Sequence, residues 1–212
     1  MPPTRMTRAT VAQAAEQLAR RDPNLRKVHR ECGTPPLLRR PATFGTLVHI
    51  ILEQQVSVES ARATFGRLRQ ASGGSITPEA VRATGPDGLR DLGFSRQKSR
   101  YAMALADNCI EGNLKVHALR RLTDEAVRDQ IVAQLGLGQW SADVFLMMAL
   151  LRPDVLPVGD LGLVKGVQEV DQVEYPDPES ILQRAETWRP YRSVATRMVW
   201  QWYVRQRRRD IF

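Results

Sequence analysis

The 212-residue sequence predicts an all-α fold of about ten helices joined by short connections. Apolar residues recur at the i, i+3, i+4, i+7 spacing that places side chains on one face of a helix. No stretch alternates polar and apolar residues for long, so no strand is predicted. Glycine and proline divide the periodic stretches at short intervals, and no repeat of roughly 20–50 residues is visible.

The predicted helices of the first half span residues 7–21, 41–56, 58–71, 77–84, 89–93 and 95–111. Helix 41–56 has the clearest apolar stripe, and Pro41 suits its first turn because proline lacks the N–H that would be unpaired there. Asp22-Pro23-Asn24 is read as the stop of the first helix. Residues 31–41, with three prolines, are read as a loop. Thr77 is a predicted N-cap.

The predicted helices of the second half span residues 124–135, 139–151, a stretch beginning after Asp160, 177–188 and 191–205. Residues 114–122 form a short connector before them. Thr123 is the predicted N-cap of helix 124–135, and Arg189-Pro190 separates the last two helices.

Composition favours a nucleic-acid partner. The net charge is +8, and the hydrophobic content of 42% is ordinary for a globular protein. An arginine-rich genome can produce the same basic bias. The stretch 205–210 is read as a solvated end; together with Arg96, Lys98 and Arg100 it adds attraction to phosphate. No apolar run approaches the roughly 20 residues of a membrane helix and no signal peptide is visible, so we expect a cytoplasmic protein, nucleoid-associated if bacterial.

Two short stretches can carry chemistry, and each also has a plain structural explanation. The Gly136-Leu137-Gly138 turn precedes a helix start, whose unpaired N–H groups and positive dipole end bind anions such as phosphate. A simple C-cap glycine explains that turn as well. Asp160 is either the N-cap of the next helix or an ionised carboxylate facing a cleft, and one group can be both.

Other polar and aromatic residues are less decisive. Gln54 and Gln55 end an apolar helix with two amides, which suits a turn that points into a cleft. Trp140 lies on the apolar stripe of helix 139–151, so core packing is its default explanation. The two cysteines are far apart, which argues against a zinc site built on cysteine and against an iron–sulfur cluster.

Four segments together resemble the helix–hairpin–helix DNA glycosylases, most closely the DNA-3-methyladenine glycosylase II (AlkA-like) branch. Residues 134–164 resemble that family's hairpin, its Gly/Pro-rich loop and its aspartate. Residues 50–57 (IILEQQVS), 92–106 (LGFSRQKSRYAMALA) and 188–200 (WRPYRSVATRMVW) occur in the family's order and spacing. The resemblance covers about residue 40 to the end.

The resemblance implies a role for each residue of the expected site. Asp160 would be the catalytic carboxylate, and Gln55 the wedge inserted into the DNA stack in place of the flipped base. The base pocket would contain Trp140, Trp200, Phe44, Gln54 and Val144. The DNA backbone would be bound by Gly136, Gly138, Gln139, Ser141, Arg96 and Lys98. A monovalent cation, Na⁺ or K⁺, would be held by the carbonyls of Val132, Gln134 and Leu137.

The resemblance also implies a single catalytic domain over residues 1–212, with two helical subdomains flanking an active-site cleft. Residues 1–55 with 156–212 would form one subdomain, and residues 56–155 the other, with the helix–hairpin–helix at 124–151. The chain is too short for the N-terminal β-rich domain of the best-known enzyme type. Val144 stands where some relatives place an aromatic residue, which predicts a roomier or differently selective pocket.

The expected function is a monofunctional DNA glycosylase that acts as a monomer on double-stranded DNA and excises alkylated purines. Bifunctional relatives carry a lysine nucleophile in the hairpin helix, where this sequence reads Gln139-Trp140. Apart from the hairpin cation, no cofactor is expected. Two alternatives stay open: a same-fold glycosylase for an etheno, deaminated or oxidised base, and a hairpin module that binds DNA without catalysis.

Overall fold

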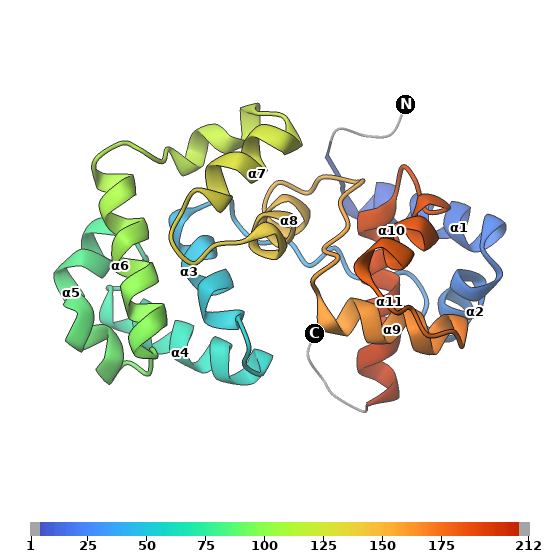
Figure 1. The fold of residues 1–212 in the computed structure, drawn as a ribbon, viewed down its shortest axis with the longest axis horizontal. Helices are drawn as coiled ribbons and strands as arrows, with labels where there is room; N and C mark the ends of the chain where they lie inside the picture. Colours follow the sequence, from blue (N-terminus) through green and yellow to red (C-terminus); the bar gives the residue numbers. More distant parts are fainter. Residues whose placement is uncertain (1–4, 208–212) are drawn as a thin grey trace. The chain divides into compact units, whose positions relative to one another are not determined.

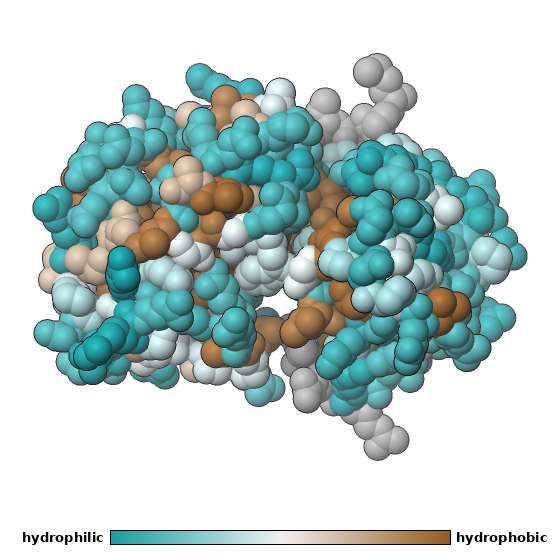
Figure 2. Space-filling model, in the orientation of Figure 1, coloured by the Kyte–Doolittle hydropathy of each residue, from teal (hydrophilic) through white to brown (hydrophobic). Residues whose placement is uncertain are grey.

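The computed structural model describes residues 5–207, where the chain forms eleven α-helices, one 3₁₀-helix and no strand (Figure 1). The predicted all-α class is confirmed. The end of the basic stretch, residues 208–210, lies outside the described residues. None of the helices in the described part combines the length and apolar composition of a membrane span. Hydrophilic residues dominate the face drawn in Figure 2, with smaller hydrophobic areas between them.

The chain divides into two compact units. Unit 1 comprises Met1–Arg39 and Leu146–Phe212, and unit 2 comprises residues 40–145. Both boundaries differ from the expected ones, because residues 40–55 belong with unit 2 and residues 146–155 with unit 1. The helix within residues 40–55 packs against two helices of unit 2, contacts that local sequence patterns do not reveal.

Unit 1 is built around α11 (Arg192–Gln206). This helix packs against α1 (Arg8–Arg21), α2 (Pro23–Cys32) and α9 (Leu161–Asp171). The short helix α10 (Pro178–Glu186) adds Ile181 and Ala185 to the same hydrophobic core. Helices α9 and α11 approach closely at Gly166, where a Cβ atom would lie 2.6 Å from Val199 Cγ1. Only glycine permits that approach.

Unit 2 contains the remaining elements, except that residues 146–148 at the end of the last of them belong to unit 1. Helix α3 (Phe44–Glu53) packs against α4 (Val58–Ala71) and α6 (Arg96–Ile110), and α6 lies along α5 (Pro78–Asp91), as Figure 1 shows. The 3₁₀-helix η1 (Val116–Arg121) leads into the hairpin pair, α7 (Asp124–Val132) and α8 (Gln139–Met148). Gly85, with a φ of 70°, breaks α5 where the sequence predicted a helix end.

The local helix-start signals are mostly confirmed. Each of the predicted N-caps Thr77, Thr123 and Asp160 accepts a hydrogen bond from the N–H three residues later. Asp22-Pro23 stops α1, as predicted, but the same pair also starts α2, a helix that was not predicted. The Asp22 carboxylate accepts from the N–H groups of Asn24 and Leu25, and Pro23 occupies the first turn.

Three predicted helices are shorter than expected. Helix α3 begins at Phe44 rather than at residue 41, α7 ends at Val132 rather than at residue 135, and α8 ends at Met148 rather than at residue 151. Beyond α8 the apolar pattern continues because the loop residues Ala149, Leu150 and Leu151 are buried as well. Leu151, with a φ of 58°, cannot continue a right-handed helix.

Candidate active site

Asp160 begins α9, and its carboxylate is tied to α11. Oδ1 of Asp160 accepts the Leu163 N–H at 2.8 Å, the capping bond, and the Trp200 indole Nε1–H at 3.0 Å. Both residues are half-buried. The N-cap interpretation of Asp160 is therefore confirmed, and the cap holds the carboxylate beside an aromatic ring.

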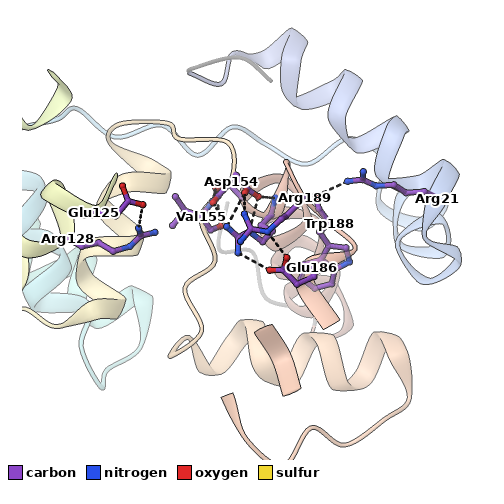
Figure 3. A network of polar contacts seen from close by, with 10 residues as sticks. Arg21, Glu125, Arg128, Asp154, Val155, Glu186, Trp188 and Arg189 are labelled. Atoms are coloured by element: carbon purple, nitrogen blue, oxygen red, sulfur yellow. Dashed lines mark hydrogen bonds and ion pairs between the residues drawn. The ribbon is translucent and has the colours of Figure 1, made fainter. Parts of the chain in front are cut away.

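The loop that leads to Asp160 is fastened to the start of α11 by a charged network (Figure 3). Asp154 accepts hydrogen bonds from the Arg192 guanidinium at 2.8 and 3.0 Å and from Arg189 at 2.7 Å. Ser193 Oγ donates to the Val155 carbonyl and accepts the Val155 N–H. The segment that carries Asp160 and the helix that carries Trp200 are therefore held together by these bonds, which lie a few residues before each of them in the chain.

In unit 2 the Gly136–Gly138 turn has the predicted geometry of a tight hairpin. Gly136 has a φ of 79°, and the Tyr101 ring packs so closely against it that a Cβ atom would overlap the ring. Gly138 precedes α8, and its carbonyl accepts the Ala142 N–H at 3.1 Å. The first N–H groups of α8 have no acceptor within the helix itself, as at every helix start. Phosphate binding by this turn stays a prediction.

A buried ion pair joins the two hairpin helices, and sequence reasoning missed it. Arg128 Nε on α7 donates to Asp143 Oδ1 on α8 at 2.8 Å, and Asp143 is only 3% exposed. The Gln139 amide lies 3.4 Å from the same carboxylate. A charged residue on the apolar face of a predicted helix is the signal that could have found it, because buried charges need partners.

Gln54 connects the end of α3 to the hairpin. Its Nε2 donates to the Gly136 carbonyl at 2.8 Å and lies 3.4 Å from Ser141 Oγ. Gln54, expected in the base pocket, therefore bonds to the hairpin. Ser141, expected to bind the DNA backbone, is buried, with 1% of its surface exposed. Gln55, the expected wedge, is exposed and has a left-handed φ of 56°. Such a conformation is uncommon outside glycine and often marks a functional turn.

Lys98 also has a structural partner. Its ammonium donates to the Leu52 carbonyl at 2.7 Å, at the end of α3, and burial lowers its pKa below the ordinary value. Arg96 is exposed. Of the two residues expected to contact the DNA backbone from α6, Lys98 thus fixes the end of α3, while Arg96 faces solvent.

The other predicted site residues are distributed between the units. Trp200 and Asp160 belong to unit 1, while Phe44, Trp140 and Val144 belong to unit 2. Phe44 and Val144 are buried and Trp140 is half-buried. The Gln134 carbonyl, one of the expected cation ligands, accepts the Leu137 N–H at 3.1 Å. A carbonyl oxygen has a second lone pair, so this bond leaves the cation prediction open.

Within residues 5–207, no three His, Cys, Asp or Glu side chains are grouped closely enough to hold a metal ion. Cys32 and Cys109 are both free thiols. Burial, with a contribution from Glu79, raises the pKa of Cys109 to about 11, so it is a poor nucleophile.

Comparison with known proteins decides the family. Residues 48–190 match the family described as HhH-GPD superfamily base excision DNA repair protein. The chain belongs to the HhH-GPD superfamily. This confirms the resemblance drawn from the four sequence segments, and the predicted helix–hairpin–helix glycosylase fold with it.

Several HhH-GPD proteins are similar over most of the chain. The putative DNA-3-methyladenine glycosylase YfjP of Bacillus subtilis is 26% identical over 186 residues, 84% of this chain and 65% of that protein. DNA-3-methyladenine glycosylase 1 of Schizosaccharomyces pombe is 26% identical over 168 residues, 77% of this chain and 74% of its own. This chain therefore spans about two thirds to three quarters of these two relatives.

Solved HhH-GPD structures agree with the fold. The S. pombe 3-methyladenine DNA glycosylase Mag1, in complex with abasic DNA, superimposes with a TM-score of 0.81 at 25% identity, covering 89% of this chain and 95% of that one. A DNA-3-methyladenine glycosidase from Bacillus halodurans gives a TM-score of 0.76 at 30% identity, covering 90% and 88%.

Proposed function

We propose that this protein is a monofunctional DNA glycosylase that hydrolyses the N-glycosidic bond of alkylated purines in double-stranded DNA. The observation that supports this most directly is the Asp160 carboxylate, held at the start of α9 by its capping bond and by the Trp200 indole. The similar proteins named as 3-methyladenine glycosylases provide the substrate class. In this proposal the protein acts as a monomer.

One carboxylate suffices for this substrate class. Most glycosidases need a second carboxyl group to protonate the leaving group. A purine alkylated at N3 or N7 already carries a positive charge, so it leaves without being protonated. Asp160 then stabilises the developing oxocarbenium ion of the sugar and orients the attacking water, whose oxygen bonds to C1′ while a proton is released.

The remaining residues of the proposed site serve base flipping. Trp200, which bonds to Asp160, offers its ring face to the flipped cationic base, a contact worth about 0.5–2 kcal/mol. Gln55 fills the gap left in the duplex, and its exposed, left-handed turn suits a residue that must project. Flipping costs a few kcal/mol and least for damaged bases that pair badly, which adds to selectivity.

Asp160→Asn tests the catalytic role. Asparagine caps helices about as well as aspartate, so the fold is retained while the charge is lost. We expect release of 7-methylguanine from alkylated duplex DNA to fall by about 100-fold or more. Asp177→Asn is the matched control, because Asp177 caps α10 of the same unit through the Ser180 N–H and lies exposed. It should excise at the wild-type rate.

The outcomes separate the alternatives. An Asp160→Asn variant that releases base as fast as wild type would show that the carboxylate is not catalytic. Wild-type protein that binds duplex DNA but releases no base from a panel of alkylated, etheno, deaminated and oxidised substrates would instead indicate a non-catalytic DNA-binding module.

Lyase activity is tested separately. Helix α8 contains no lysine, and we propose that no covalent intermediate forms. Borohydride treatment during the reaction should trap no protein–DNA adduct, whereas a trapped adduct would assign the chain to the bifunctional glycosylases.

A further inference from the structure

A shallow groove of about 520 Å³ runs along unit 2, beside the hairpin. It is formed by the second half of α5, one face of α6 and Leu135, the residue directly before Gly136. Its charged lining residues are Asp87, Arg90, Arg96, Arg100 and Asp107. Figure 1 shows α5 and α6 side by side.

The groove has an excess of positive charge once local pairs are counted. Asp87 lies 3.6 Å from Arg90, and Asp107 lies 3.6 Å from Arg82. Both acids are thus partly neutralised by their own neighbours. Arg96 and Arg100 are exposed and form no ion pair with any residue between 5 and 207. Two uncompensated guanidinium groups therefore line the same groove.

The spacing of this pair suits a phosphodiester strand. Arg96 and Arg100 are four residues apart on α6, so they project from one face about 6 Å apart along the helix axis. One strand of duplex DNA advances about 3.4 Å per phosphate along its axis, so the pair can contact two neighbouring phosphates. Lys98, between them in sequence, donates to the Leu52 carbonyl instead.

The groove is also continuous with the hairpin. Tyr101, the residue after Arg100, packs against Gly136 in the hairpin turn. Leu135, 42% exposed, forms an apolar edge next to that turn, together with Met103 and Ala104 of α6. The two arginines and this apolar edge therefore line one groove that reaches the hairpin turn.

We propose that the Arg96–Arg100 groove is a second contact for the DNA backbone, which holds a strand beyond the phosphates bound at the hairpin. The proposal rests on the proposed function only in taking DNA as the ligand, and it assigns no role in base excision. The groove adds sequence-independent affinity and leaves the chemical step unchanged.

The test is the salt dependence of DNA binding. The probe is a duplex with a stable abasic-site analogue, titrated by fluorescence anisotropy from about 50 to 200 mM salt. For Arg96→Gln/Arg100→Gln we expect the slope of log K against log salt to fall by about 2, because each lost phosphate contact removes about 0.9. Kd should rise several-fold.

Arg120→Gln is the matched control, since Arg120 is an exposed arginine of unit 2 outside the groove. It should leave both Kd and slope at wild-type values. The proposal is overturned if the double variant binds with an unchanged slope, or if Arg120→Gln lowers the slope by about 0.9, as the loss of one phosphate contact would. A lower slope in a protein that releases no base would support the groove while refuting the proposed catalytic function.

Discussion

The indole N–H of Trp200 donates a 3.0 Å hydrogen bond to Oδ1 of Asp160, the same oxygen that caps α9. Forty positions separate the two residues in the chain. This tryptophan, expected as a wall of the base pocket, therefore also orients the proposed catalytic carboxylate. A substitution can remove the N–H donor while keeping an aromatic ring, so the two contributions can be tested independently.

Trp200→Phe keeps an aromatic face and removes the donor. Hydrogen bonds to charged groups contribute about 1.5–3 kcal/mol, so we expect base release at saturating enzyme to slow by about 10-fold or more. Trp202→Phe is the control on the same helix, since Trp202 Nε1 is buried and has no hydrogen-bond partner in the described part of the chain. The Trp202→Phe variant should release base at the wild-type rate. If Trp200→Phe releases base equally fast, the Trp200 hydrogen bond makes no contribution to catalysis.

Gly136→Ala should destabilise the hairpin. An alanine Cβ would overlap the Tyr101 ring, and a φ of 79° is strained for any L side chain. Together we expect a loss of about 3 kcal/mol in the free energy of unfolding, measured by urea denaturation. Gly138→Ala, where a Cβ atom would meet nothing within 4 Å, should change stability by less than about 1 kcal/mol. Comparable losses in the two variants would contradict the role of the Tyr101 contact.

Asp22 makes the stability of unit 1 depend on acid pH. Burial alone would raise its pKa, but hydrogen bonds from the Leu25 N–H, Arg184 and Trp188 together lower it below the usual 3.8. The carboxylate therefore stabilises the fold fully above pH 3.8, and this contribution is lost as pH falls through the folded-state pKa.

Asp22→Asn tests this contribution. At pH 7 the variant should lose about 2–3 kcal/mol in the free energy of unfolding, because the Arg184 and Trp188 donors lose their charged acceptor. The difference from wild type should shrink below pH 3.8 as the wild-type carboxyl group is protonated. Tryptophan fluorescence suits the measurement, since Trp188, Trp200 and Trp202 all belong to unit 1. A difference independent of pH would point to packing rather than charge.

Arg197 is a fully buried cation held by three carbonyls. Its guanidinium donates to Leu37, Ser193 and Met147 at 3.0, 2.8 and 2.7 Å. Burial lowers its pKa to about 10, so it remains protonated at pH 7. We expect Arg197→Met to reduce the free energy of unfolding by about 3 kcal/mol, because the carbonyls lose their donors.

The control for Arg197 is a surface arginine of the same unit. Arg189 pairs with Asp154 and Glu186, but its side chain is 49% exposed. Arg189→Met should therefore cost less than about 1 kcal/mol. A loss as large as that of Arg197→Met would show that the Asp154 network, rather than burial, sets the stability of this region.

Local signals in the sequence identified most helices and the family. Helix caps and apolar stripes depend on residues three or four positions apart. The caps at Thr77, Thr123 and Asp160 could therefore be predicted from the sequence. Helix α2 was missed because Asp22-Pro23 ends one helix and starts the next, and proline is compatible with both. The domain boundaries were misplaced because they depend on which helices pack together.

The order of the residues was enough to predict an all-α chain of the HhH-GPD superfamily with Asp160 at a helix start and glycines in the hairpin. Three long-range hydrogen bonds became visible only in the folded chain: Trp200 to Asp160, Gln54 to the Gly136 carbonyl, and Arg197 to the Leu37 carbonyl, 160 positions away. The physical reason is that a side chain's polar partner is set by the packing of whole helices. Periodicity says which face of a helix is buried, but not which distant group it meets.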